Sequence, residues 1–169
     1  SPPTPCGCTF SWTGWWPRSR TLGVTSDMEL DELYQEVLLD HYRKPRHAGP
    51  VSDDELTAEE VNPSCGDHIR LAVRVEAGRI QSVRHQSRGC AISVASASIM
   101  ADFAVGRTPE EFRRTADTVI AMLRGDRPWD PVAIPDLEAL GGVHRFPMRV
   151  KCATMCWHAM KKALDTLGV

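Results

Sequence analysis

The sequence lacks the features that identify several large classes of protein. No apolar run approaches the roughly 18–20 residues of a membrane span, and no apolar stretch has the form of a secretory signal. Basic and acidic residues nearly balance, 20 against 22, so the positive surplus typical of nucleic-acid binders is missing. A glycine-rich nucleotide-binding motif and an H-E-x-x-H metalloprotease motif are also absent. We therefore expect a soluble, cytoplasmic protein without nucleic-acid or membrane partners.

The composition of the chain changes near residue 27. Residues 1–27 are rich in Pro, Ser, Thr, Gly and Trp, and they follow neither helical nor strand periodicity. The lone C-x-C pair in this stretch, Cys6 and Cys8, is weak evidence for a metal or redox site. We predict a disordered N-terminal extension at 1–27 and a single domain at 28–169, which is long enough for a hydrophobic core.

Helical periodicity starts at the beginning of this domain. Ser26 and Glu29 have the spacing of a capping box, in which the side chain of each residue accepts a hydrogen bond from the backbone N–H of the other. Apolar residues then recur at helical intervals, and Pro45 stops the helix. These residues are Leu30, Leu33, Tyr34, Val37 and Leu38.

A small sheet follows the first helix. Residues 69–75 alternate between apolar and polar side chains, which predicts a half-buried strand. The turn sequence EAGR at 76–79 lets residues 80–87 return as a second strand, and the segment 55–62 can add a third.

Downstream of the sheet, the sequence predicts helices. The segments 89–106 and 108–123 carry helical patterns, and the second of them opens with a good helix start at Thr108. A stretch broken by prolines and glycines holds one short helical piece at 134–140, and a long C-terminal helix carries Cys152 near its start. This order predicts an α+β fold, with a small three-stranded antiparallel sheet packed against several helices.

Four cysteines lie within the predicted domain. Cys65 stands in a polar loop beside Asp67, Cys90 lies where a strand gives way to a helix, and Cys152 lies near the start of the last helix. Three ends of secondary-structure elements can thus bring short side chains to one point. In a reducing compartment, metal or thiol chemistry is more common than disulfides.

The alternative is that these cysteines are ordinary buried small residues. We favour that interpretation for Cys156, which lies on the apolar stripe of the last helix one turn after Cys152. Spacing alone makes a metal site at Cys65, Asp67, Cys90 and Cys152 plausible but leaves it unproven, because gaps this long match no general zinc pattern.

Four motifs in order resemble the SufU branch of the IscU-like (NifU N-terminal domain) family of iron–sulfur cluster assembly proteins. They are LYQEVLLDHYRKPRHAG, NPSCGDHIRL, GCAISVASASIM and RVKCATMCWHAMKKAL. The resemblance covers the chain from about Met28 to the C-terminus. It implies an IscU/SufU-like fold in which Cys65, Asp67, Cys90 and Cys152 form the metal site.

Two features point to the sulfur-transfer branch of the family that the chain resembles. Scaffold-type members have a histidine just before the third cysteine, where this chain has Lys151, and residues 124–147 resemble the insertion of SufU-type proteins. The resemblance implies a bound Zn²⁺. Together with three thiolates and one carboxylate, the ion would give the site a formal charge of -2. Arg149 and Lys151 either offset this charge or are ordinary solvated residues at a helix start.

The resemblance also implies an activity. A SufS-type, pyridoxal-phosphate-dependent cysteine desulfurase would hold a persulfide, and Cys65 would accept its sulfur and pass it to the downstream cluster-assembly machinery. The alternatives are a scaffold that carries a transient iron–sulfur cluster on the same cysteines, and a purely structural zinc domain. We expect His41 and Tyr42 to pack or to contact a partner, and His68 to lie at the surface.

Overall fold

The computed structural model describes residues 26–131 and 133–169, with side chains from Tyr34 onward. The predicted extension at 1–27 lies outside these residues except for its last two, which begin helix α1. The α+β class and the order of helix, sheet and helices are confirmed. The elements are α1 (Ser26–Arg43), β1 (Ala58–Asn62), β2 (Asp67–Glu76), β3 (Arg79–Arg88), α2 (Ala91–Ala104), α3 (Pro109–Arg124), the 3₁₀ helices η1 (Pro135–Leu140) and η2 (Val143–Arg145), and α4 (Pro147–Thr166).

The sheet has the antiparallel order β1-β2-β3, as the sequence predicts. Along β2, buried residues alternate with more exposed ones, so one face of the sheet packs on the core and the other meets solvent. A tight turn at Ala77 and Gly78, both with positive φ, joins β2 to β3. The strand β1 is shorter than the predicted segment 55–62.

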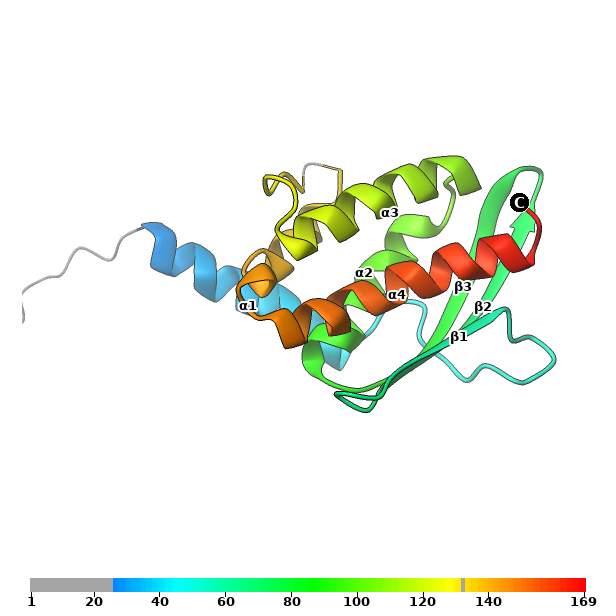
Figure 1. The fold of residues 1–169 in the computed structure, drawn as a ribbon, viewed down its shortest axis with the longest axis horizontal. Helices are drawn as coiled ribbons and strands as arrows, with labels where there is room; N and C mark the ends of the chain where they lie inside the picture. The colour runs from blue at the N-terminus through cyan, green and yellow to red at the C-terminus, as the bar shows by residue number, and fades with distance from the viewer. Residues whose placement is uncertain (1–25, 132) are drawn as a thin grey trace, which may run out of the picture.

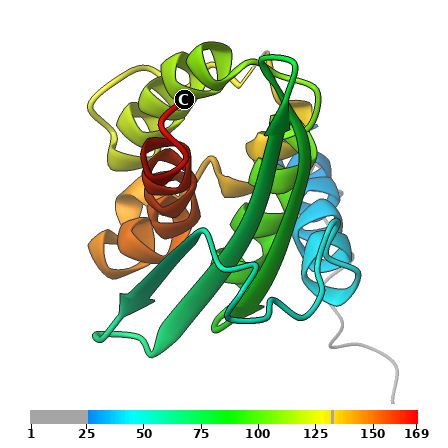
Figure 2. The ribbon, with the colours of Figure 1, turned by 90° about the vertical axis from the view of Figure 1, so that its right-hand side faces the viewer.

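The helices cover one face of the sheet (Figures 1 and 2). Helix α2 packs on β3, and α4 packs on β1 and β2, while α1 lies against α2 and α3 against α4. The core is mostly aliphatic and includes an aromatic pair between α3 and α4: Trp157 stacks on Phe112 with ring centroids 5.9 Å apart, and both side chains are fully buried. The last helix therefore lies in the middle of the molecule and holds the other layers together.

Several predicted element boundaries shift by one or two residues. The short helical piece near 134–140 is the 3₁₀ helix η1, and the helix predicted at 89–106 is α2, which begins at Ala91. Helix α4 begins at Pro147, so Cys152 lies in its second turn. The helix start at Thr108 is a complete capping box with Glu111. The side chains of the capping box predicted at Ser26 lie outside the described ones.

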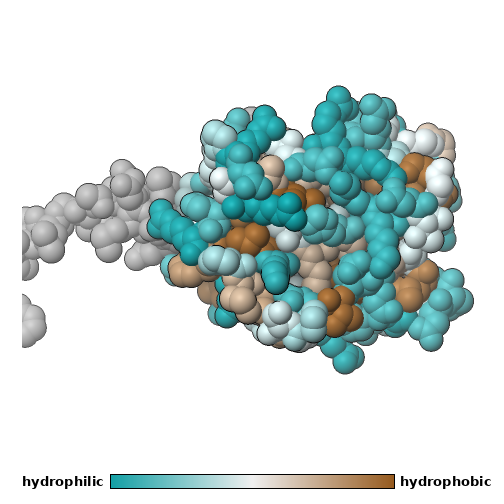
Figure 3. Space-filling view, viewed as in Figure 1, coloured by the Kyte–Doolittle hydropathy of each residue, from teal (hydrophilic) through white to brown (hydrophobic). Residues whose placement is uncertain are grey.

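The surface in the view of Figure 1 is mostly hydrophilic, and apolar residues occur on it as separate patches (Figure 3). Within residues 26–131 and 133–169, no helix is long and apolar enough to cross a membrane.

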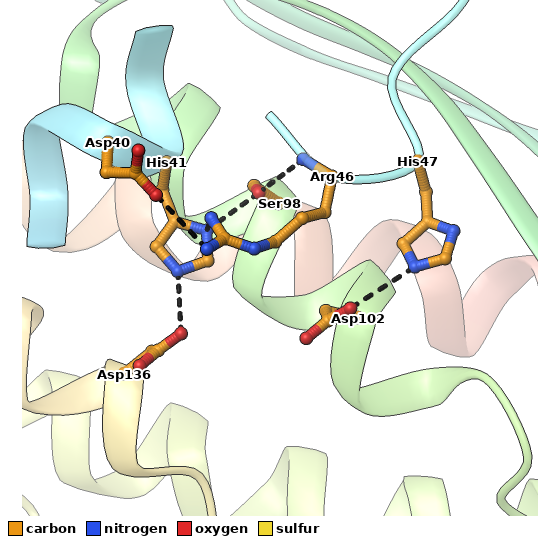
Figure 4. Close-up of polar contacts among 7 residues, drawn as sticks. All are labelled: Asp40, His41, Arg46, His47, Ser98, Asp102 and Asp136. Atoms are coloured by element: carbon orange, nitrogen blue, oxygen red, sulfur yellow. Dashed lines mark hydrogen bonds and ion pairs between the residues drawn. The ribbon is translucent and has the colours of Figure 1, made fainter. Parts of the chain in front are cut away.

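A buried polar cluster around His41 joins α1 to α2 and η1 (Figure 4). His41 is 1% exposed; its Nδ1 lies 2.8 Å from Ser98 Oγ and 2.9 Å from Arg46 Nη1, and its Nε2 lies 2.9 Å from Asp136 Oδ2. Because a guanidinium only donates, Nδ1 accepts and Nε2–H donates to Asp136. Ser98 is fully buried and also accepts from the Arg46 N–H, so this Ser–His–Asp chain has no room for a substrate. The cluster is structural, and the expectation that His41 packs is confirmed.

Candidate metal centre

The turn between β1 and β2 presents Cys65 to solvent. The backbone N–H groups of Cys65 and Gly66 donate to Asn62 O, at 3.3 and 2.8 Å, and close the turn. Gly66 has φ +71°, a left-handed conformation that glycine adopts without steric cost, and nothing lies within 4 Å of the position that a Cβ would take there. Cys65 is exposed, whereas Asp67, the first residue of β2, is fully buried.

Asp67 and Cys90 are joined where β2 meets the start of α2. The Asp67 carboxylate accepts from the Cys90 backbone N–H at 3.0 Å, and the Cys90 Sγ lies 3.8 Å from Asp67 Oδ2. Cys90 is the N-cap residue of α2. Gly89 makes this approach possible, because a Cβ there would come within 2.7 Å of Asp67 Cγ.

Cys152 closes the cluster from α4. Its Sγ lies 3.4 Å from Cys65 Sγ and 3.8 Å from Asn62 Nδ2, and its side chain is fully buried. The sulfur and carboxylate atoms of Cys65, Asp67 and Cys152 lie within 4.8 Å of one another, a spacing at which one ion can bind all three. Cys90 is outside this compact group of three but touches it through Asp67.

The electrostatics of the cluster suit a cation. Burial raises the pKa of the Cys152 thiol, and its hydrogen bonds with Asp67 and Cys65 and the charge of Cys90 raise it further. Four acidic groups this close repel one another when ionised, and a divalent cation reverses that balance. Three thiols and a carboxylate are ligands that zinc accepts.

Comparison with known proteins identifies the family. The model of the NifU-like N-terminal domain matches residues 33–166, which is most of the chain. The chain belongs to the NifU-like N-terminal domain family. The resemblance carried by the four sequence motifs is thereby confirmed.

Relatives in this NifU-like family carry two kinds of name. The chain is 38% identical to the zinc-dependent sulfurtransferase SufU of Bacillus subtilis, over 83% of this chain and 95% of that protein. It is 36% identical to the iron–sulfur cluster assembly scaffold protein IscU of Streptococcus pyogenes, over 80% and 85% of the two chains.

Solved structures of NifU-like proteins share the fold. The crystal structure of FiSufU from Fervidobacterium islandicum AW-1 superposes with a TM-score of 0.68 at 28% identity, over 76% of this chain and 94% of that one. A NifU-like protein from Brucella abortus superposes with a TM-score of 0.71 at 21% identity, over 82% and 96%. The IscU/SufU-like arrangement of sheet and helices is therefore confirmed.

The two basic residues before Cys152 have different surroundings in this NifU-like chain. The pKa of the Arg149 guanidinium is raised, first by the charge of Cys90 and then by hydrogen bonds with Cys90 and Cys152. The Arg149 guanidinium is therefore close enough to Cys90 and Cys152 for them to affect its pKa, and its supporting role stays a prediction. Lys151 points instead into a groove between β1 and α4, where Arg124 and His158 also lie.

Cys156 lies apart from the cluster. Its side chain is 1% exposed and its Sγ lies 3.3 Å from Ser96 Oγ, and burial raises its pKa to about 12. This agrees with its interpretation as an ordinary core residue. His68 lies near the solvent-facing side of the sheet, where its Nε2 bonds Glu59 at 2.5 Å.

Asn62 is the neighbour of the cluster that sequence analysis missed. It is 8% exposed and directs its amide at Cys152, yet it belongs to the same NPSCGD motif that carries Cys65. Its position three residues before Cys65, at the end of a strand, is the signal that marks it.

Proposed function

We propose that this chain is a zinc-dependent sulfurtransferase for iron–sulfur cluster assembly, with Cys65 as the sulfur acceptor. The observation that carries the proposal is one exposed thiol, Cys65, whose sulfur lies 3.4 Å from the buried Cys152 sulfur in a cluster that includes Asp67. The B. subtilis relative named as a zinc-dependent sulfurtransferase supports it. The donor is a SufS-type, pyridoxal-phosphate-dependent cysteine desulfurase that carries a persulfide.

Zinc would be held by Cys65, Asp67, Cys90 and Cys152. When bound, it would keep the thiols deprotonated at neutral pH, which is the chemistry that sulfur transfer needs. The donor set fits this role, because the pKa of Cys152 is raised by burial and by its acidic neighbours and only a cation offsets that effect.

Residues of the chain itself would carry out the transfer step. The Cys65 thiolate attacks the outer sulfur of the donor persulfide, so that a new S–S bond forms on Cys65, the donor S–S bond breaks and the donor leaves as a thiolate. The turn at Gly66 presents Cys65 to the partner. Arg149 offsets negative charge at Cys90 and Cys152, and Asn62 donates an amide N–H to Cys152.

A scaffold that assembles a transient iron–sulfur cluster on the same cysteines is the second candidate. The S. pyogenes relative named as an IscU scaffold favours it. Lys151 stands where scaffold-type members have a histidine, which favours sulfur transfer instead.

Persulfide mapping tests the proposal. The zinc-loaded chain is incubated with a cysteine desulfurase and cysteine, and persulfides are located by alkylation and mass spectrometry. We expect the persulfide on Cys65, and none on the chain in Cys65→Ala. The matched control is Cys156→Ala, which removes a buried thiol outside the cluster and leaves sulfur acceptance unchanged. A persulfide that forms equally well in Cys65→Ala would refute the assignment.

A further inference from the structure

A groove of about 420 Å³ lies beside the thiol cluster, between β1 and α4. This volume is within the range of small-molecule sites. Ser64, the neighbour of Cys65, and Asn62, which contacts Cys152, both line the groove. A molecule in the groove therefore contacts the residue that precedes Cys65 in the chain and the residue whose amide contacts Cys152.

The groove is lined by positive charge. Lys151 comes from α4, and Arg124 comes from the last turn of α3. His158 also lines the groove from α4, but burial and then the charges of Arg124 and Lys161 lower its pKa, so the positive charge comes from the other two residues. Within residues 34–131 and 133–169, neither Lys151 nor Arg124 has an ion-pair partner. The acid in the groove, Glu60, is already paired with Lys162 at 2.9 Å.

The remaining walls of the groove suit a short carbon chain. Met155, which is 8% exposed, and the exposed Val61 provide apolar surface between the polar groups. Two cationic side chains and a small apolar patch, one residue along the chain from the proposed sulfur acceptor, match a small thiol that bears carboxylates. Charged walls raise the local concentration of such an anion.

We propose that this groove binds an anionic, carboxylate-bearing low-molecular-weight thiol, which takes the sulfur from Cys65. The inference rests on the proposed function, because it supplies the acceptor for the persulfide formed there. The thiolate of the small molecule attacks the outer sulfur of the Cys65 persulfide. A new persulfide forms on the small thiol, the S–S bond at Cys65 breaks, and Cys65 returns to the thiolate without net oxidation or reduction.

Sulfur release from a chemically loaded chain tests the proposal. The zinc-loaded chain is treated with inorganic polysulfide, and release is followed with mercaptosuccinate and with the neutral 2-mercaptoethanol. After correction for the thiolate fraction, we expect mercaptosuccinate to react about tenfold faster at low salt, the lower end of what charge steering gives. In the double variant Arg124→Gln/Lys151→Gln, the ratio of the mercaptosuccinate rate to the 2-mercaptoethanol rate should fall to about one. The control Arg114→Gln, an exposed arginine earlier on α3, should keep the preference.

Binding of an unreactive analogue separates this proposal from the proposed function. We expect (methylthio)succinate to shift NMR signals of residues 60–64, and 2-(methylthio)ethanol to shift none. Binding of the anion without persulfide on Cys65 in the desulfurase experiment would refute only the sulfur-acceptor role. Two outcomes would refute only the role of the groove, provided that Cys65 carries the persulfide. In one, both thiols release the sulfur equally fast. In the other, the preference for mercaptosuccinate is unchanged in Arg124→Gln/Lys151→Gln. Binding of an acidic peptide but not of (methylthio)succinate would also overturn the small-thiol proposal.

Discussion

At the residue scale, the candidate centre depends on the close approach of Gly89 to Asp67. A side chain at position 89 would place its Cβ against the Asp67 carboxylate, in a backbone conformation with φ +150°. The carboxylate also accepts the Cys90 N–H, so a shift of Asp67 disturbs two of the four proposed ligands at once. Glycine at this position is therefore a requirement of the site.

We predict that Gly89→Ala weakens zinc binding at least tenfold, roughly the effect of losing a supporting contact at a metal site. Competition with a chromogenic chelator measures this affinity. Gly78→Ala is the matched control, since Gly78 also has positive φ but no other atom within 4 Å of the position its new methyl group would take. It should cost about 1 kcal/mol of unfolding free energy through backbone strain and leave zinc affinity unchanged. Equal zinc affinity in both variants would contradict the role given to Gly89.

Cys156 gives a prediction about pH. Its pKa is raised from 9.0 to about 12 by burial, so between these values the unfolded chain has lost a proton that the folded chain keeps. Stability is therefore full below pH 9 and falls as the pH rises, by about 1.4 kcal/mol per pH unit from this group. Urea unfolding of the zinc-loaded chain measures it. Cys156→Ala should show a shallower decline over this window, and identical slopes would contradict the burial of the thiol.

At the element scale, the His41 cluster fastens α1 to α2 and η1. We predict that His41→Ala lowers the free energy of unfolding by about 2–4 kcal/mol, because the buried Ser98 loses a partner and a cavity opens. Chemical denaturation measures the change. Tyr42→Ala removes the neighbouring side chain, which is 43% exposed, and should cost about 0.5 kcal/mol or less. A similar loss in both variants would show that the cluster is not what joins these elements.

Periodicity in the sequence explains how much of these elements could be predicted. Strand alternation in 69–75 and the helix start at Thr108 are local signals, and both appear in the structure at the expected places. The His41 cluster has no such signal, because its partners Ser98 and Asp136 are 57 and 95 residues away in the chain. The 3₁₀ form of η1 was equally hidden, because a short segment with a proline start is compatible with either helix type.

At the scale of the whole molecule, the fold brings distant ligand candidates together. Cys65 and Asp67 come from one turn, Cys90 from the start of α2, and Cys152 from α4, which packs against β1 and β2. The residue types and their places at element ends were predictable from the sequence. The 3.4 Å approach of the Cys65 and Cys152 sulfurs was not, because it depends on how α4 packs on the sheet.

The central claim is that zinc in this cluster enables sulfur transfer. The most direct measurement is metal analysis of the purified chain, followed by sulfide release with a cysteine desulfurase, cysteine and reductant, before and after zinc removal. We predict about one zinc per chain, as one four-ligand site requires, and a rise in sulfide release that disappears without zinc. The claim would be contradicted if zinc removal left sulfide release unchanged and a coloured iron–sulfur cluster formed on the chain. That result would favour the scaffold.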